Sequence, residues 1–253
     1  LYHTVPHVRL AKGLVERSFA DRVFFCNSGA EANEAALKFA RKWARTHHGP
    51  DKHRVVAFTG GFHGRTVGAL SCTANAAYRE PFAPLMDGVR FAPWSDIDAL
   101  TKLVTDETCA VILEPLQGEG GVWPTAPGFL AEVRELCDRH QALLIFDEIQ
   151  CGLGRTGTLW AHEEEGVTPD LMTLAKPLAG GLPIGAVLAT EAVAEVMAPG
   201  DHGSTFAAGP LVCAAAEVVL NRVAAPGFLA QVRARGAQLQ AALAGLHHPA
   251  VVE

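Results

Sequence analysis

Two side chains of opposite charge stand at the ends of two apolar runs, where they could do chemistry together. Asp147 ends the run 142–147, and Lys176 ends a second run, LMTLAK, 29 residues later. Because ligands bind outside the carboxyl ends of the strands in open α/β sheets, an acid and an amine at two such ends converge on one crevice. Buried Asp and Lys residues are costly unless they are paired or used in chemistry. The alternatives are a structural ion pair, or two exposed strand ends that never meet.

The segment Asn27-Ser28-Gly29 precedes a helix that the apolar spacing predicts from about Ala30. Ser28 and Glu31 have the spacing of a capping box, which explains both residues without any ligand. The free N–H groups and the positive end of the helix dipole would also bind an anion such as phosphate, with Gly29 allowing a close approach. The two interpretations are compatible, and both stay open.

A glycine-rich loop, 60–68, follows a predicted strand and contains Phe62, His63 and Arg65. The same residues could form an ordinary surface, but the position after a strand favours a binding site. An arginine is suited to bidentate binding of a carboxylate. His63 alone distinguishes neither a metal ligand nor an acid–base group.

Two further loops contain side chains that could serve a site. Glu119 lies between glycines at the end of a strand, where it would either be solvated or gate a site. Ser204 and Thr205 would be hydroxyl donors, or would cap the helix that begins at Pro210.

Strands and helices are predicted to alternate along the chain, which implies a mostly parallel sheet with helices on both faces, an α/β fold. The predicted strands are 23–26, 54–59, 89–93, 109–115, 142–147, 171–176 and 184–190. The predicted helices are 8–19, the one from Ala30, one capped by Ser95, 127–140, 191–197, the one from Pro210, and 228–246.

Composition restricts the binding partners and the location that can be expected for this protein. The 253 residues contain 49% hydrophobic and 19% charged residues with a net charge of −6, typical of a globular protein that binds neither nucleic acid nor anionic membranes. The six cysteines are scattered without a CxxC pair, which predicts a reducing, cytoplasmic location. Neither a signal peptide nor an apolar run long enough to span a bilayer is evident.

Three other motifs are weaker candidates. Gly152, Gly154 and Gly157 have the GxGxxG spacing of nicotinamide-binding folds, but residues 147–151 separate them from the strand and no long helix is predicted to follow. The pairs His47–His48 and His247–His248 have no Cys or carboxylate at ligand spacing, so no metal site is predicted. A GxSxG motif, which would indicate a serine hydrolase, does not occur.

Taken together, these residues resemble the class III pyridoxal-phosphate aminotransferases of fold type I. The matching segments span nearly the whole chain in the family's order: FFCNSGAEANEAALKFAR, FHGRT, AVILEPLQGEGGV, LLIFDEIQCGLGRTG, TPDLMTLAKPLAGGLPIGA and HGSTF. The resemblance implies that residues 1–225 are a large cofactor-binding domain, incomplete at its N-terminus. Residues 226–253 would be a connector helix towards a small C-terminal domain that is largely missing.

The resemblance also implies roles at the cofactor, pyridoxal 5′-phosphate. Lys176 would bond covalently to its aldehyde carbon and, once displaced by substrate, would move the proton. Asp147 would pair with the pyridine nitrogen, Gln150 would hydrogen-bond near the phenolic oxygen, and Phe62 would stack on the ring. The cofactor phosphate would be held by Ser28, Gly29 and Ala30.

Substrates and a partner subunit follow from the same resemblance. Arg65 would bind the substrate α-carboxylate with Ser204 nearby. Glu119 would pair with a second arginine and release it when 2-oxoglutarate is bound. Thr205 would reach the phosphate of the neighbouring subunit, so a homodimer is expected.

The implied reaction transfers the δ-amino group of N-acetylornithine to 2-oxoglutarate, giving the semialdehyde and glutamate in arginine biosynthesis. An alternative is another ω-amino donor, namely ornithine, 4-aminobutyrate or a carrier-linked lysine. A catalytically silent truncated subunit that only pairs with partners is a second alternative, and a nicotinamide oxidoreductase is a third.

Overall fold

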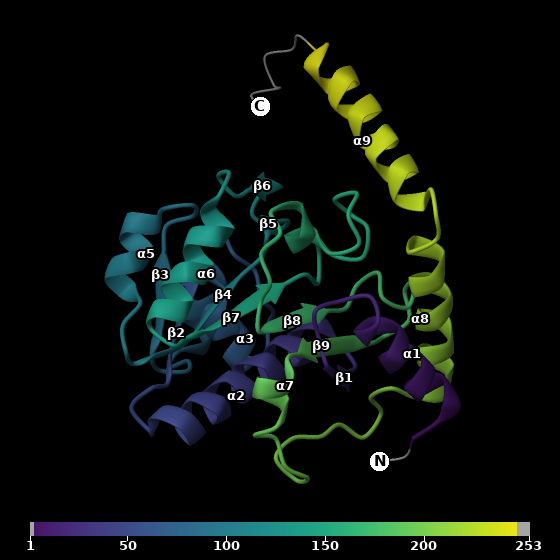
Figure 1. The fold of residues 1–253 in the computed structure, drawn as a ribbon. Helices are drawn as coiled ribbons and strands as arrows, with labels where there is room; N and C mark the ends of the chain where they lie inside the picture. Colours follow the sequence, from purple (N-terminus) through teal and green to yellow (C-terminus); the bar gives the residue numbers. More distant parts are fainter. Residues whose placement is uncertain (1–2, 247–253) are drawn as a thin grey trace.

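A computed structural model describes residues 3–246 (Figure 1). The helices are α1 (Val5–Val15), α2 (Gly29–His48), α3 (Val67–Cys72), α4 (Ala76–Arg79), α5 (Ile97–Leu103), α6 (Phe129–Arg139), α7 (Glu191–Ala194), α8 (Pro210–Val223) and α9 (Phe228–Ala244), with 3₁₀ turns η1 (Glu80–Phe82) and η2 (Ala161–Glu164). The strands are β1 (Arg22–Cys26), β2 (Arg54–Phe58), β3 (Val89–Ala92), β4 (Thr108–Leu113), β5 (Leu116–Gln117), β6 (Trp123–Pro124), β7 (Leu143–Asp147), β8 (Leu171–Leu174) and β9 (Gly185–Ala189).

The central sheet has seven strands in the order β1-β9-β8-β7-β4-β2-β3. The pairs from β8 to β3 are all parallel, whereas β9 runs antiparallel to both of its neighbours. The predicted mostly parallel sheet is therefore confirmed. Strands β4, β7 and β8 are buried along their whole length, which explains why their sequences are unbroken apolar runs.

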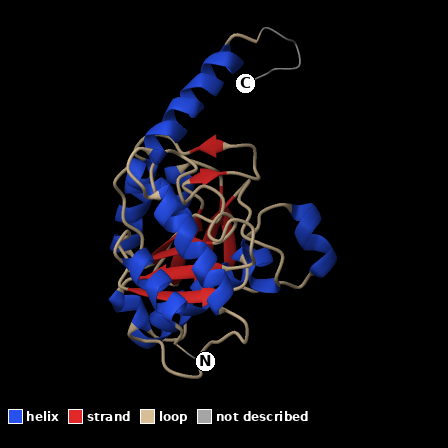
Figure 2. Cartoon of the chain, turned by 90° about the vertical axis from the view of Figure 1, so that its right-hand side faces the viewer, coloured by secondary structure: helices blue, strands red, loops and turns tan. Residues whose placement is uncertain are grey.

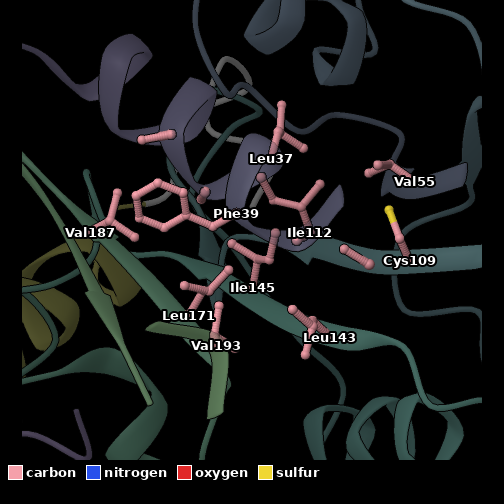
Figure 3. Close-up of a cluster of buried hydrophobic side chains, with 14 of the residues drawn as sticks. Leu37, Phe39, Val55, Cys109, Ile112, Leu143, Ile145, Leu171, Val187 and Val193 are labelled. Carbon is pink, nitrogen blue, oxygen red and sulfur yellow. The ribbon is translucent and has the colours of Figure 1, made fainter. Parts of the chain in front are cut away.

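Helices cover both faces of this sheet, because alternate strand residues point to opposite sides. On one face, α2 packs its alanine-rich side and Phe39 against residues such as Ile112 and Ile145 (Figure 3). On the other face, α5 and α6 cover β3, β2, β4 and β7, while α1 and α8 cover β8, β9 and β1. Figure 2 shows the strands enclosed between these helices.

Helix α9 extends away from the body of the molecule (Figure 1) and has no buried residue. Its contact with the body includes a hydrogen bond from Arg233 Nη1 to the carbonyl of Gly157. The division at residues 225 and 226 stays a prediction, and residues 247–253, with the pair His247–His248, lie outside the described residues. Within residues 3–246, no single helix meets the length and hydropathy that a membrane span requires; α8 and α9 meet them only as a pair bent by 70°.

Element ends differ from the predictions where a local contact decides them. The first helix ends at Val15 instead of residue 19. Asp96, and not Ser95, caps α5, accepting from the N–H of Ala99 at 2.9 Å. Ser95 itself has a φ of 55° and accepts from the N–H of Ala126 at 3.0 Å. The sequence reading was therefore wrong by one residue at this cap, because Ser and Asp are equally good caps.

Candidate active site

A cavity of about 420 Å³ opens where β7 and β8 end and α2 begins. Both Asp147, the last residue of β7, and Lys176, two residues beyond β8, line it. The two predicted strand ends thus meet, and no ion pair joins them among residues 3–246. Lys176 is exposed and lines the cavity, whereas Asp147 is buried. The predicted site residues in this cavity are Ser28, Gly29, Ala30, Phe62, Arg65, Asp147, Gln150 and Lys176.

Asp147 is the most enclosed acid of the cavity, with an exposed fraction of 2%. Its Oδ2 atom accepts from Asn33 Nδ2 at 2.7 Å and faces His63 Nδ1 at 2.8 Å, while Oδ1 accepts from the N–H of Ile149 at 3.1 Å. Burial lowers the pKa of His63, but the hydrogen bond to Asp147 and its charge outweigh burial and raise that pKa overall. These contacts hold the Asp147 carboxylate in one direction at the cavity wall, where it can accept from a ligand atom that carries a proton.

The N-terminus of α2 forms another wall. Ser28 caps the helix, accepting from the N–H of Glu31 at 3.2 Å. The expected capping box is altered. The carboxylate of Glu31 accepts from the N–H and from the side-chain Nδ2 of Asn27, at 2.8 and 2.9 Å, and not from the N–H of Ser28. The first N–H groups of a helix lack intrahelical partners, so those at Gly29 and Ala30 remain suited to an anion.

Two glycines let neighbouring elements approach the cavity closely. A Cβ atom at Gly29 would lie 2.9 Å from the side chain of Ile149, and one at Gly118 would lie 2.3 Å from Gln150. Gln150 in turn accepts a hydrogen bond from Lys176 Nζ at 2.5 Å. The amine of Lys176 is therefore held at the cavity by Gln150, whose side chain has room only because residue 118 is a glycine.

The 60–68 loop contributes Phe62, His63 and Arg65 to the cavity. The carboxylate of Glu114 fixes this loop, accepting from the N–H of Phe62 at 3.0 Å and of Gly118 at 3.1 Å. Arg65 is exposed, and its guanidinium carbon lies 3.6 Å from the centre of the Tyr78 ring and 5.5 Å from that of Phe62. An arginine held on aromatic faces keeps its N–H edge available for a carboxylate.

The other predicted site residues lie outside this cavity. Thr205 and Ser204 line a second cavity of about 480 Å³ with His202, and Ser204 Oγ accepts from Asn27 Nδ2 at 2.8 Å. Glu119 lines a third cavity, of about 430 Å³, whose wall includes Phe62 and Tyr78. Neither hydroxyl residue caps α8, whose N-cap is Gly209.

Sequence reasoning missed three residues of the site: Asn33, Glu114 and Tyr78. Glu114 follows the apolar run CAVIL as Asp147 follows ALLIF, so the same signal could have found it. Asn33 occupies the buried face of α2, where a fully enclosed polar residue marks a required hydrogen bond. Tyr78 gave no signal, because only the fold brings α4 next to Arg65.

The GxGxxG segment forms no dinucleotide site. Residues 152–156 form turns and Gly157 a bend, and the first helical segment after them is the four-residue 3₁₀ turn η2 instead of a long α-helix. A Cβ atom at Gly152 would lie 2.7 Å from the carbonyl oxygen of Glu148, so this glycine serves packing. In the part of the chain that the structure describes, no three His, Cys, Asp or Glu residues cluster as metal ligands would.

Comparison with known proteins relates this geometry to a family. A relative from Alnus glutinosa, named acetylornithine aminotransferase, mitochondrial, is 56% identical over 93% of this chain and 53% of its own length. An acetylornithine aminotransferase from Vibrio parahaemolyticus is 54% identical over 94% of this chain and 59% of its own length. The chain therefore spans between half and three fifths of these relatives.

Solved structures of aminotransferases have the same fold as this chain. The ornithine aminotransferase of Toxoplasma gondii superposes with a TM-score of 0.91 at 37% identity, covering 96% of this chain and 58% of the other. For N-acetylornithine aminotransferase from Stenotrophomonas maltophilia, the TM-score is 0.81 at 43% identity, covering 96% and 59%. The family model described as "Aminotransferase class-III" matches residues 1–253. The chain belongs to the class-III aminotransferases, whose cofactor is pyridoxal phosphate.

Proposed function

We propose that this chain is the cofactor-binding part of a transaminase that moves the δ-amino group of N-acetylornithine to 2-oxoglutarate. The products are the semialdehyde of N-acetylglutamate and glutamate. The observation that supports this most is the meeting of Lys176, Asp147 and the start of α2 in one cavity. Because the chain spans about half the length of its relatives, the reaction is proposed for the whole protein.

The cavity fits pyridoxal phosphate. It offers an exposed amine at Lys176, a buried carboxylate at Asp147 and a helix N-terminus, the three partners that an aldehyde, a pyridinium nitrogen and a phosphate require. Because Gly29 has no Cβ atom, the side chain of Ile149 packs directly against the first turn of α2. A solved structure of the Toxoplasma gondii ornithine aminotransferase is described as having partial occupancy of this cofactor at its active site.

Each residue then has a defined task. When bound, the cofactor supplies an electron sink that stabilises negative charge on the amino-acid carbon. Lys176 would attach the cofactor and carry the proton. Gln150, which accepts a hydrogen bond from the Lys176 amine, would hydrogen-bond near the phenolic oxygen of the cofactor. Asp147 keeps its charge beside the pyridine nitrogen, and Phe62 covers the ring. The phosphate is held by Ser28, Gly29 and Ala30.

Arg65 binds the carboxylate that lies away from the reacting carbon, which is the α-carboxylate of the donor and the distal carboxylate of 2-oxoglutarate, so both half-reactions use one site. Ser204 accepts a hydrogen bond from Asn27, which lines the same cavity as Arg65, and would lie near the bound carboxylate. Glu119 gates the acceptor by pairing with a second arginine. The names of the relatives support N-acetylornithine as the donor. Ornithine is the alternative donor that a structural relative favours.

The active form is a homodimer in which Thr205 reaches the phosphate of the neighbouring subunit. Thr205 lies outside the cavity of Lys176, as a residue donated to a partner would. Its loop also exposes 82% of the Phe206 side chain, and α8 exposes 75% of Leu211. Exposed apolar side chains of this kind are typical of an interface. The cytoplasmic location stays a prediction, and all six cysteines are buried free thiols.

Borohydride reduction of the protein with pyridoxal phosphate, followed by peptide mass mapping, tests the cofactor site. We expect a label on Lys176, absent from Lys176→Arg, with N-acetylornithine-dependent glutamate formation in the full-length enzyme. Circular dichroism establishes that the chain is folded. A folded chain without a label at Lys176 would contradict the proposal and favour the catalytically silent subunit.

A further inference from the structure

A buried amide lies directly behind the carboxylate of the cavity. Asn33, on α2, has an exposed fraction of 0%, and its Nδ2 atom donates to Asp147 Oδ2 and to the carbonyl of His63, both at 2.7 Å. Its Oδ1 atom accepts from the hydroxyl of Thr173 on β8 at 2.8 Å. Thr173 is fully buried as well.

The orientation of this amide follows from its neighbours. Asp147 Oδ2 and the His63 carbonyl are both acceptors, so the atom that faces them must be the NH₂ group. The opposite atom is then the oxygen, which the Thr173 hydroxyl satisfies. An inverted amide would set its oxygen 2.7 Å from a carboxylate oxygen. The Thr173 hydroxyl can donate or accept, so it donates to the orientation that Asp147 and the His63 carbonyl impose.

We propose that Asn33 is a positioning residue for Asp147, and that the hydrogen bond from Thr173 holds the Asn33 amide in place. Asn33 joins α2, whose first turn forms the phosphate wall, to the acid at the end of β7. The two ends of a bound cofactor would thereby be held at a fixed separation by one side chain. This inference rests on the proposed function, since it assigns Asp147 to the pyridine nitrogen.

The substitution Asn33→Asp gives a signature that a merely structural role would not give. Two carboxylates at this distance share one proton, and the protonated carboxyl introduced at position 33 then donates to Asp147 as the amide does. Once that proton leaves, two negative charges repel each other. The other charged groups near Asp147 are His63, Glu114, Glu148 and Lys176. They are present in both proteins, and wild type measured over the same pH range shows their own contribution.

Cofactor affinity of the full-length apoprotein, measured by fluorescence titration between pH 6 and pH 9, is the main readout. For Asn33→Asp relative to wild type, we expect a dissociation constant within about threefold at pH 6 and about 10- to 100-fold weaker at pH 9. Asn33→Ala should lose affinity at every pH, and Thr173→Val should lose part of it, with Thr173→Ser restoring it. Thr108→Val, which alters a buried hydroxyl on β4 bonded to the N–H of Thr105, is the matched control and should leave affinity unchanged.

A loss in Asn33→Asp that is equal at all pH values, or no loss, would overturn the inference. Urea unfolding of the apoproteins gives a second readout without cofactor. The stability of Asn33→Asp relative to wild type should fall as pH rises, because the folded carboxylate pair holds a proton that the unfolded chain has lost. If wild type binds no cofactor, the proposed function fails, while this unfolding result still decides whether Asn33 and Asp147 are coupled.

Discussion

Asp147 shows how single residues build this site, because its two oxygens form hydrogen bonds with groups from three different parts of the chain. His63 comes from the loop after β2, Asn33 from α2 and Ile149 from the turn after β7. A buried carboxylate with several donors keeps a fixed direction. The direction matters because the acid must meet a single ring nitrogen.

The substitution Asp147→Asn separates the charge of this side chain from its shape. Asparagine replaces one oxygen by an NH₂ group, which cannot accept from any of these three donors. We expect the turnover of the full-length enzyme to fall roughly 10²- to 10³-fold, while borohydride still labels Lys176. Steady-state kinetics and peptide mapping measure the two effects, and an unchanged rate would remove Asp147 from the mechanism.

Arg65 provides a second test, because its guanidinium stacks closely on the Tyr78 ring, with the Phe62 ring farther away. Tyr78→Leu should raise the Michaelis constants of the amino donor and of 2-oxoglutarate together, by about threefold to tenfold, with little change in kcat. Tyr78→Phe keeps the ring face and is the matched control. If Leu and Phe at this position behave alike, the stacking does not position the arginine.

Asp147 and Lys176 could be predicted because each ends an apolar run that becomes a buried strand. Asn33 and Tyr78 could not be assigned roles in the same way. Their roles depend on which helix crosses which strand end, and this is a long-range property that no local pattern contains. For Thr205, the local motif HGSTF could be detected in the sequence, but its proposed role involves another subunit.

At the scale of elements, the position of the start of α2 depends on the last residue pair that joins β1 to β9. Cys26 pairs with Gly185, and a Cβ atom at Gly185 would lie 2.3 Å from the carbonyl oxygen of Ser28. The obstacle is backbone, which cannot rotate away as a side chain does. The helix mouth and β9 therefore depend on the same glycine.

We expect Gly185→Ala to lower the free energy of unfolding by about 1–3 kcal/mol and to weaken cofactor binding, because Ser28 must move. Gly203→Ala is the control, since its Cβ atom would meet nothing within 4 Å. Urea denaturation and cofactor titration measure the two effects. Equal stability and affinity in the two variants would show that β9 does not set the position of the helix.

Strand positions were predictable at this scale, and element ends were less so. The seven strands of the sheet match seven predicted apolar runs to within two residues at each end. The short hairpin of β5 and β6 was not predicted, because two-residue strands have no periodicity to detect. The reversed direction of β9 also has no local signal, since burial on both faces gives the same apolar run in either direction.

At the scale of the whole molecule, the buried acid Glu148 couples folding to pH. Its exposed fraction is 1%, and its oxygens accept from the N–H groups of Ala161 and His162 at 2.7 and 2.8 Å. Burial outweighs these bonds and raises the pKa of Glu148 from 4.5 to about 8. In that window the folded protein holds a proton that the unfolded chain has lost, so stability falls as pH rises.

Two histidines also make the stability depend on pH, and their contributions have opposite signs. The raised pKa of His63 contributes stability that is complete below 6.5 and is lost as pH rises through the folded value. Burial lowers the pKa of His162, so its contribution increases with pH only up to 6.5. Above pH 6.5 the fall caused by Glu148 and His63 is therefore unopposed by His162.

We expect the free energy of unfolding of the apoprotein to fall by about 2 kcal/mol between about pH 6.5 and pH 8.5 because of Glu148. Glu148→Gln cannot titrate, so urea denaturation should show a smaller fall in this variant, whatever its stability at the lower pH. Glu164→Gln, which neutralises an exposed acid of η2, is the control and should keep the wild-type slope. An unchanged slope in Glu148→Gln would mean that Glu148 stays ionised in the folded protein, held by the two N–H groups of η2.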